Sequence, residues 1–236
     1  MLFDLIANAL FPPVCVACGR RIEAGAACAT CFGAISVNNS FACGAGGAAA
    51  HSTVQFRHPA FPCLIGGAAS YEDPAVRELI RSLKFKSISA AAEPLGDLIF
   101  AFTHRTGFDA APYDYLLPIP LSARRRRTRG YNQADLIARR FARRITEAGR
   151  RPPPIAPPNL LVRTRNTRPQ SGLANETDRQ ANVRGAFGVP DAVIVQGRSF
   201  ILIDDVATSG STIAAAADAL RAAGATDIVA LAAAKA

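Results

Sequence analysis

From residue 66 to the C-terminus, short apolar runs alternate with longer stretches whose apolar residues recur at helical spacing. Short continuous apolar runs predict buried strands, and they lie at 66–72, 113–121, 159–164, 185–189, 200–204 and 227–234. The amphipathic stretches predict helices at 74–85, 90–104, 132–148 and 211–224. Strands that are apolar throughout and alternate with helices are typical of a mainly parallel sheet flanked by helices on both faces. We therefore expect an α/β fold.

The connecting segments also carry signals. We expect an arginine-rich loop at 124–130 and an extended, exposed, proline-rich connection at 150–158. A polar stretch at 163–184 exceeds the usual loop length, which is typical of functional or mobile segments. On the helix at 132–148, four arginines are expected on the outer, solvated face: Arg139, Arg140, Arg143 and Arg144.

All six cysteines lie within the first 65 residues, and this clustering divides the chain more clearly than any linker does. We expect two domains: a cysteine-rich module at 1–65 that begins with a short helix at 1–11, and an α/β domain at 66–236. The segment 1–11 lacks the basic start and the small-residue cleavage site of a signal peptide. No apolar run approaches the ~20 residues that span a bilayer, so we expect no membrane span and a cytoplasmic protein.

The module contains two C-x2-C pairs, Cys15 with Cys18 and Cys28 with Cys31. Each pair can present two thiolates from a tight turn, and four thiolates satisfy tetrahedral Zn²⁺. Buried free thiols or a redox pair are the alternatives. We favour a structural zinc site, which holds a small module together without chemistry of its own.

Two further cysteines, Cys43 and Cys63, lack the second member of such a pair. A second metal site that recruits His51 or His58 is one interpretation. Because two ligands of such a site are missing, we expect these cysteines to be buried or vestigial instead.

The formal net charge of +9 comes almost wholly from arginine, because lysine occurs only at positions 84, 86 and 235. Arginine favours planar, bidentate recognition of phosphate and carboxylate, so phosphorylated ligands and nucleic acid become candidate partners. A solvated basic surface is the alternative. The chain has no tryptophan and few aromatic residues near its arginines, which disfavours a stacking platform for single-stranded DNA.

Near the C-terminus the chain reads SFILIDDVATSGST. Ligands bind beyond the carboxyl ends of parallel strands, and Asp204 and Asp205 stand at such an end. The small residues 207–212 lead into a helix that Ser211 or Thr212 could cap, and bare backbone at a helix start favours a phosphate. The carboxylates would repel that phosphate, so they fit hydroxyl groups of a sugar on the same ligand. The residues indicate a sugar phosphate, the alternative being an incidental acid pair beside a capped helix.

ILIDDVATSGST resembles the motif with which type I phosphoribosyltransferases bind PRPP, 5-phosphoribosyl 1-pyrophosphate. Three other segments are similar to the ComF family, the competence-associated phosphoribosyltransferase-like proteins: LLPIPL, RRRRTRGYNQA and TRPQSGLANETDRQANVRGAF. With the N-terminal cysteine module, this resemblance covers essentially the whole chain. It implies a type I phosphoribosyltransferase-like fold and a link to DNA uptake or utilisation.

The resemblance also assigns roles to residues. Asp204 and Asp205 would bind the ribose hydroxyls, and the 5-phosphate would lie against Ala207, Thr208, Ser209, Gly210, Ser211 and Thr212. Pyrophosphate and a flexible loop would involve Pro118, Ile119, Pro120, Gln170, Arg179 and Asn182. The expected catalytic cations are Arg127 and Arg129, with Lys84 added because lysine is so rare in this chain. Mg²⁺ is expected with PRPP, since it keeps to substrate oxygens and needs no dedicated protein cage.

For these residues a structural role is the alternative: a solvated basic turn for the arginines, and bracing of a loop for Gln170 and Asn182. Two functions stay open. The first is a pentosyl glycosyltransferase, or a PRPP-binding protein, with magnesium pyrophosphate as the leaving group. The second is a single-stranded DNA-binding accessory protein of DNA uptake, in which the PRPP site is regulatory or vestigial. The shared motif does not identify the acceptor, the molecule that receives the ribose. We expect the variable segment that covers the acceptor, called the hood, to lie within 66–107.

Overall fold

The computed structural model describes residues 12–43, 63–165 and 185–236. Its helices are α2 (Ala29–Gly33), α3 (Pro74–Phe85), α4 (Ala92–Thr106), α5 (Ala123–Arg129), α6 (Gln133–Glu147) and α8 (Ser211–Ala222), with 3₁₀ turns at Ser89–Ala91 and Ala192–Ile194. Its strands are β1 (Ala42–Cys43), β2 (Leu64–Ser70), β3 (Tyr115–Pro118), β4 (Val162–Arg163), β5 (Phe187–Gly188), β6 (Phe200–Ala207) and β7 (Ile228–Lys235). The helix predicted at 1–11 lies outside the described residues. Within them, no helix has both the length and the apolar character needed to cross a bilayer.

Among the described residues, a five-stranded sheet with the order β1-β2-β7-β6-β3 forms the centre of the molecule. Strands β2, β7, β6 and β3 run parallel, and the two-residue β1 pairs antiparallel with β2. Strands β4 and β5 form a separate antiparallel pair. The prediction of a mainly parallel sheet flanked by helices is confirmed.

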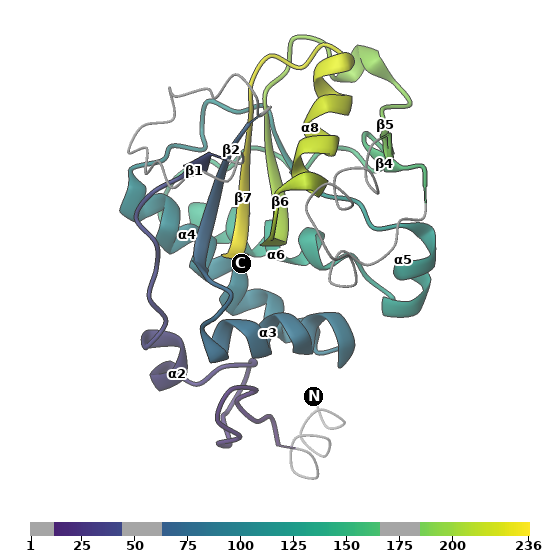
Figure 1. Ribbon diagram of the computed structural model, residues 1–236. Coiled ribbons are helices and arrows are strands. Elements are labelled where there is room, and N and C mark those ends of the chain that lie inside the picture. Colours follow the sequence, from purple (N-terminus) through teal and green to yellow (C-terminus); the bar gives the residue numbers. More distant parts are fainter. Residues whose placement is uncertain (1–11, 44–62, 166–184) are drawn as a thin grey trace.

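Both faces of the sheet are buried. In β6, Ile201 and Ile203 pack in an apolar cluster with α4 and α6, whereas Phe200 and Leu202 pack in a second cluster with α8. Figure 1 shows α4 and α6 behind the sheet and α8 in front of it. Because successive side chains of a strand point to opposite faces, one uninterrupted apolar run fills both layers.

Helix α3 lies across the carboxyl end of the parallel strands (Figure 1). Pro74 is its first residue, as predicted, and the Asp73 side chain caps it by accepting hydrogen bonds from two backbone N–H groups of the first turn. Its apolar face joins the cluster around α4 through Val76, Leu79, Ile80 and Leu83. This orientation brings the last turn of α3, which carries Lys84, to the strand ends.

The expected arginine-rich loop is instead the short helix α5. The Ser122 hydroxyl caps it by accepting a hydrogen bond from the N–H of Arg125, and Gly130 ends it with a φ of 78°. A residue with positive φ is a common helix terminator, and glycine adopts that conformation without steric cost. The arginines of this segment therefore stand on a helix surface rather than on a loop.

The proline-rich connection at 150–158 is extended, as predicted, but it is not simply exposed. Leu116 of β3 donates its N–H to the carbonyl of Pro154 and accepts a hydrogen bond from the N–H of Ala156. The segment thus lies along the outer edge of β3. Proline is tolerated at a sheet edge because the missing N–H there does not interrupt a ladder.

The prediction that the α6 arginines are all solvated is wrong for Arg140. Its guanidinium bonds both carboxylate oxygens of Asp97 in α4, at 2.7 and 3.1 Å, and its side chain is only 17% exposed. Arg144 lies over the ring of Phe100, also in α4. Acidic and aromatic side chains of α4 therefore hold much of the positive charge of α6, which makes this helix a poor surface for nucleic acid.

Candidate active site and candidate metal centre

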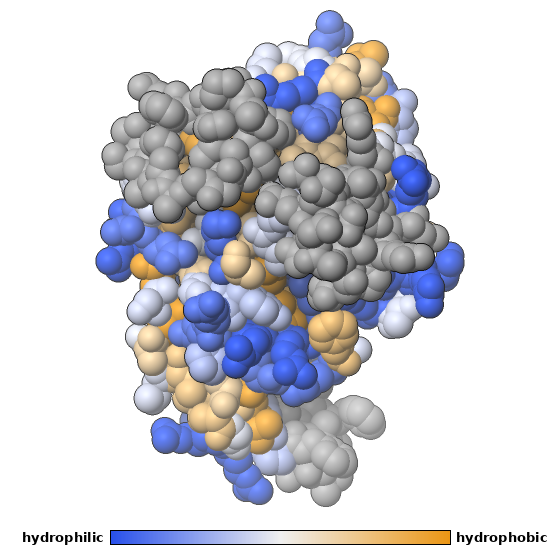
Figure 2. Space-filling view, in the orientation of Figure 1, coloured by the Kyte–Doolittle hydropathy of each residue, from blue (hydrophilic) through white to orange (hydrophobic). Residues whose placement is uncertain are grey.

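The two adjacent acids lie towards the carboxyl end of β6, at the edge where β2, β3 and β7 also end. The Asp205 side chain is 5% exposed, and its Oδ1 lies 2.8 Å from the Nζ of Lys84. Lys84, which was predicted as a site residue because lysine is so rare in this chain, is thus in direct contact with one member of the acid pair. Hydrophilic residues gather over α3, the helix that supplies this lysine (Figure 2).

The second carboxylate oxygen of Asp205 has a different environment. Its Oδ2 is buried and has no hydrogen-bond partner among the residues that the structure describes. A buried acceptor without a partner costs about 1–3 kcal/mol, so a donor from a ligand would stabilise this arrangement. A sugar hydroxyl is such a donor.

Asp204 is held differently from its neighbour. Its Oδ1 accepts a hydrogen bond from the N–H of Asp205 at 2.8 Å, and the residue is partly exposed. Burial, followed by the charge of Asp205, raises the pKa of Asp204 to about 7, although Lys84, the Asp205 N–H and Arg163 oppose this. Near neutral pH, Asp204 is therefore partly a carboxylic acid, which can donate as well as accept a hydrogen bond.

Two arginines add positive charge beside the acids. Arg129, at the end of α5, is partly exposed; burial lowers the pKa of its guanidinium, and the two acids oppose that effect. Arg163, in β4, lies over the ring of Phe187 at 5.2 Å; burial lowers its pKa, and the charge of Asp204 raises it. Sequence reasoning missed Arg163, although an arginine inside a predicted apolar strand was an available signal. Arg127 is exposed on α5, and its catalytic role stays a prediction.

The small residues after β6 form a turn that requires glycine. Gly210 has a φ of 75°, which side chains disfavour, and it is the N-cap of α8. The prediction that Ser211 or Thr212 caps the helix is wrong, because α8 begins at Ser211 and its N-cap has no side chain. The Ser209 hydroxyl instead lies 3.0 Å from the Ser211 hydroxyl and accepts the Ser211 N–H at 3.4 Å. The loop presents backbone and hydroxyls at the positive end of a 12-residue helix, an arrangement that favours phosphate.

The proline turn after β3 lies beside the acids. Ile119 is buried, and Pro118 and Pro120 on either side of it are partly exposed. Ile119 donates its N–H to the carbonyl of Ile203, and its own carbonyl accepts a hydrogen bond from the side-chain amide of Asn132. The turn is thereby tied to the position immediately before the acid pair. The other residues predicted here, Gln170, Arg179 and Asn182, lie outside the described residues.

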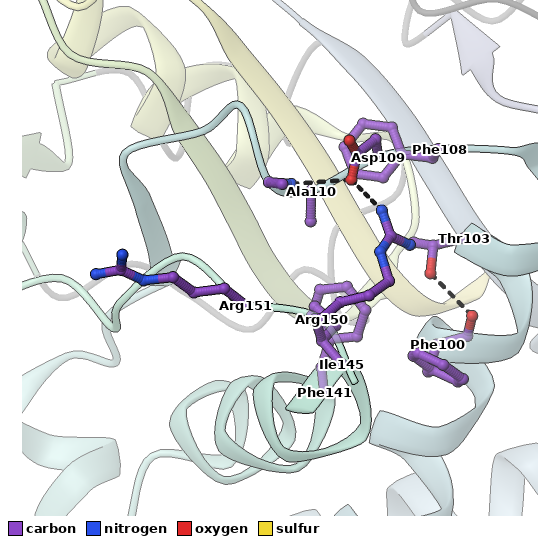
Figure 3. A pocket seen from close by; sticks show the side chains of 10 residues that line it. Phe100, Thr103, Phe108, Asp109, Ala110, Phe141, Ile145, Arg150 and Arg151 are labelled. Atoms are coloured by element: carbon purple, nitrogen blue, oxygen red, sulfur yellow. Dashed lines mark hydrogen bonds and ion pairs between the residues drawn. The ribbon is translucent and has the colours of Figure 1, made fainter. Parts of the chain in front are cut away.

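A small pocket lies away from these residues. Figure 3 shows its lining side chains from α4, from α6 and from the segment 108–110 that precedes β3. Its volume of ≈ 10 Å³ has room for about one water molecule, and Arg150 pairs with Asp109 at its side. Because this segment leads into β3, the pocket lies at the amino ends of the strands, opposite the acid pair. It is therefore separate from the candidate active site.

The two C-x2-C pairs come together, as predicted. The sulfurs of Cys15, Cys18, Cys28 and Cys31 all lie within 4.8 Å of one another, and Cys18 Sγ is 3.9 Å from Cys28 Sγ. Tetrahedral zinc with Zn–S bonds of about 2.3 Å requires sulfurs about 3.8 Å apart. The donor set and its spacing therefore fit a closed structural zinc site.

The backbone of the module also favours thiolates. Burial raises the pKa of Cys15, but backbone N–H groups of Cys28, Cys18 and Ala17 outweigh it and bring this pKa to about 6. Hydrogen bonds with the Cys28 and Cys18 thiols raise the pKa of Cys31 to about 12. Thiolates this close repel one another, so Cys31 keeps its proton, and a divalent cation bound to all four sulfurs would remove that repulsion.

The prediction of a buried cysteine is confirmed for Cys63. It packs in the apolar cluster on the α8 face, and burial raises the pKa of its thiol to about 12. The side chain of Cys43 lies outside what the structure describes, as do His51 and His58.

We predict that Asp204→Asn reduces the pH dependence of stability. The pKa of Asp204 is about 7 in the folded protein against an ordinary 3.8, so the folded state binds this proton more tightly than the unfolded state does. The resulting stabilisation is complete below about pH 4 and is lost as the pH rises through about 7. Urea unfolding at about pH 5 and pH 8 should show that the wild type loses about 2–3 kcal/mol more than the variant. The exposed Asp191→Asn serves as control, and an equal pH dependence in wild type and Asp204→Asn would contradict the prediction.

We also predict one zinc ion per chain. Cys18→Ser removes an exposed ligand and should release the metal and lower the melting temperature, because the module has little core of its own. Cys63→Ala is the matched control, since it removes a cysteine outside the cluster and should keep the metal. Elemental analysis of the purified proteins measures the ratio, and two zinc ions per chain would show that the cluster is not the whole metal content.

Comparisons with known proteins agree with this metal centre. Residues 6–61 match the double zinc ribbon domain family. Together with the four-sulfur cluster, this match supports a structural zinc ion.

Individual proteins are also similar to this chain. The DNA utilization protein YhgH of Escherichia coli strain K12 is 33% identical over 155 residues, which are 62% of this chain and 61% of that protein. The YhgH protein of Salmonella typhimurium strain LT2 is 29% identical over 178 residues, 69% of this chain and 73% of its own length. Competence protein F of Haemophilus influenzae is 35% identical over 101 residues, 42% of this chain and 40% of that protein. The chain thus spans about 61% of the length of the Escherichia coli relatives. These matches confirm the predicted resemblance: the chain is similar to proteins named DNA utilization protein YhgH and competence protein F.

Proposed function

We propose that the protein binds PRPP between its acid pair and the loop 207–212, and that it transfers or holds the phosphoribosyl group with magnesium pyrophosphate as the leaving group. The observation that carries this proposal is the buried carboxylate of Asp205, with one oxygen paired to Lys84 and the other buried without a hydrogen-bond partner among the described residues. A phosphate alone would be repelled by this carboxylate. A sugar alone would leave the helix start at Gly210 without an anion. A ribose 5-phosphate satisfies both.

Each part of PRPP has a place in this proposal. The ribose hydroxyls donate hydrogen bonds to Asp204 and Asp205, and the 5-phosphate lies at the N-terminus of α8. Pyrophosphate faces Lys84, Arg129 and the proline turn after β3, where charge-assisted hydrogen bonds hold it. Mg²⁺ bound to the substrate oxygens would supply further neutralisation of the pyrophosphate charge.

The transfer itself requires little covalent chemistry from the protein. The bond from C1 of the ribose to pyrophosphate breaks, and its electron pair leaves on the pyrophosphate oxygen. The lone pair of an acceptor nitrogen then forms the new bond to C1, and the acceptor loses a proton to solvent. Positive charge develops on the ribose ring near the acids, while Lys84 and Arg129 receive the negative charge that departs.

The names of the relatives support a biological setting. Proteins called DNA utilization protein and competence protein F are similar to this chain, and we extend a role in DNA uptake or utilisation to it on that basis. The boundary at residue 65 and the cytoplasmic location are parts of the same proposal.

One observation favours a second function, binding of single-stranded DNA. Three arginines of α5 are exposed: Arg124, Arg126 and Arg127. They stand on the same short helix as Arg129, whose pKa the acid pair influences, whereas Arg140 and Arg143 of α6 pair with acids of α4. In this alternative, PRPP regulates a protein that binds DNA through α5.

Calorimetry with PRPP and Mg²⁺ tests the main proposal. We expect the wild type to bind and Asp204→Asn/Asp205→Asn to lose at least about 100-fold in affinity, because each hydrogen bond to a charged group contributes about 1.5–3 kcal/mol. A matched control, Asp109→Asn/Asp191→Asn, removes two exposed carboxylates elsewhere and should bind like the wild type. The proposal is wrong if the wild type does not bind PRPP, or if the acid-pair variant binds it undiminished.

Fluorescence anisotropy with a labelled oligonucleotide, repeated across a salt series, tests the second function. Each phosphate contact contributes about 0.7 to the slope of log affinity against log salt for single strands. Arg124→Gln/Arg126→Gln should therefore reduce this slope by about 1.4. The control Arg139→Gln/Arg143→Gln changes two exposed α6 arginines that are paired with Asp135 and Glu93 and should change the slope much less. Equal slopes for both pairs would exclude α5 as the DNA-binding surface.

A further inference from the structure

The connection between α5 and α6, residues 130–132, is bonded to two walls of the candidate active site. The Asn132 side-chain amide donates a hydrogen bond to the carbonyl of Ile119 in the proline turn after β3. The Tyr131 hydroxyl donates one of 2.7 Å to the carbonyl of Leu83 in α3, 48 positions earlier in the chain. The fold thus brings this hydroxyl to the last turn of the helix that carries Lys84.

The end of α3 receives support from Tyr131. The last four carbonyls of a helix lack intrahelical partners, and the carbonyl of Leu83 is among them. Ser87, shortly after the helix, has a φ of 55°, a left-handed conformation that is unfavourable for a residue with a side chain. The hydroxyl therefore satisfies an acceptor at a helix end whose backbone is otherwise strained.

This hydrogen bond also fixes the origin of the Lys84 side chain. The carbonyl of Leu83 and the Cα of Lys84 belong to one planar peptide group, so an atom that holds the carbonyl also holds that Cα. The Lys84 Nζ lies 2.8 Å from Asp205 Oδ1, and a buried ion pair requires accurate geometry to be favourable. Because the lysine stem is flexible, the position of its backbone matters for the contact.

From this geometry we propose that Tyr131 is a positioning residue: its hydroxyl acts through the peptide group of Leu83 to hold Lys84 against Asp205. The inference rests on the proposed phosphoribosyl site, in which Lys84 faces the pyrophosphate, and it names a residue that supports ligand binding without touching the ligand. The Tyr131 ring packs against the apolar cluster that contains Leu83. Phenylalanine would keep that packing and remove only the hydroxyl.

Labelling of lysine tests the effect on Lys84 without any ligand. The chain has only three lysines, at positions 84, 86 and 235, so mass spectrometry after brief treatment with acetic anhydride can follow each one. We expect Tyr131→Phe to raise the acetylation rate of Lys84 about threefold to tenfold, the range that one hydrogen bond provides. Lys235, in β7, is the internal reference and should not change.

Tyr113→Phe is the matched control variant. It also removes a tyrosine hydroxyl, one that donates to Asp227 Oδ2 at 3.2 Å. Tyr113 precedes β3 and Asp227 precedes β7, so this contact lies at the amino ends of the strands, opposite the acid pair. The control should leave the acetylation of Lys84 as it is in the wild type.

Calorimetry on the full chain with PRPP and Mg²⁺ tests the consequence for the ligand. Tyr131→Phe should weaken binding about threefold to tenfold, whereas Tyr113→Phe should bind like the wild type. The double variant Tyr131→Phe/Lys84→Met should bind as tightly as Lys84→Met alone, because the hydroxyl acts through the lysine. A merely structural role of the hydroxyl would weaken binding in both backgrounds.

The outcomes separate this inference from the proposed function. If Lys84 reacts at the wild-type rate in Tyr131→Phe, the hydroxyl does not position the lysine and the inference is wrong. It is also wrong if PRPP binds Tyr131→Phe undiminished, or if the loss persists in the Lys84→Met background. If the wild type does not bind PRPP, the proposed function fails, and the labelling comparison alone decides whether Tyr131 positions Lys84.

Discussion

The candidate site depends on the buried ion pair between Lys84 and Asp205. Removing a carboxylate from water costs several kcal/mol, and the ammonium 2.8 Å away offsets this cost only while α3 holds it there. Three features fix that helix: the Asp73 cap, its buried apolar face, and the hydrogen bond from the Tyr131 hydroxyl to the end of α3. The ion pair between Lys84 and Asp205 therefore connects α3 to β6.

The cysteine module contributes to the same constraint. Ala26 and Ile35 of the module belong to the apolar cluster that contains Leu79 of α3, and the Asn38 side-chain amide donates to the carbonyl of Gly67 in β2 at 2.7 Å. In Figure 1, α2 lies below the sheet, to the left of α3. A structural ion that folds the module therefore also supports the helix that positions Lys84. The zinc site and the proposed PRPP site are linked by shared packing, without the metal contacting the ligand.

The sheet, its helices and the acid pair could be predicted because their signals are local in the sequence. An apolar run that leads into Asp204 and then into small residues identifies both a strand and the turn at its carboxyl end. Arg163 was missed although it stands inside a predicted apolar strand, because its surroundings come from the register of β4 against β5, which places it over Phe187, a residue distant in the chain. For the same reason helical periodicity assigned Arg140 to solvent, whereas Asp97 of another helix pairs with it. Long-range contacts decide the surroundings of both residues, and the local pattern does not show which residues make those contacts.

The raised pKa of Asp204 resolves a conflict between the two acids and the proposed ligand. Two ionised carboxylates side by side repel each other, and Lys84 contacts only Asp205 among the pair's described contacts. With a pKa of about 7, Asp204 is partly neutral at neutral pH, which relieves that repulsion in the ligand-free protein. Hydrogen bonds donated by ribose hydroxyls favour the ionised form of a carboxyl group, and the charges of Arg163 and Arg129 favour it too. In the proposed complex, binding of the sugar therefore favours ionisation of Asp204, and ionisation of Asp204 favours binding. Both carboxylates would then be negatively charged beside the ribose ring, which becomes positively charged in an oxocarbenium-like transition state.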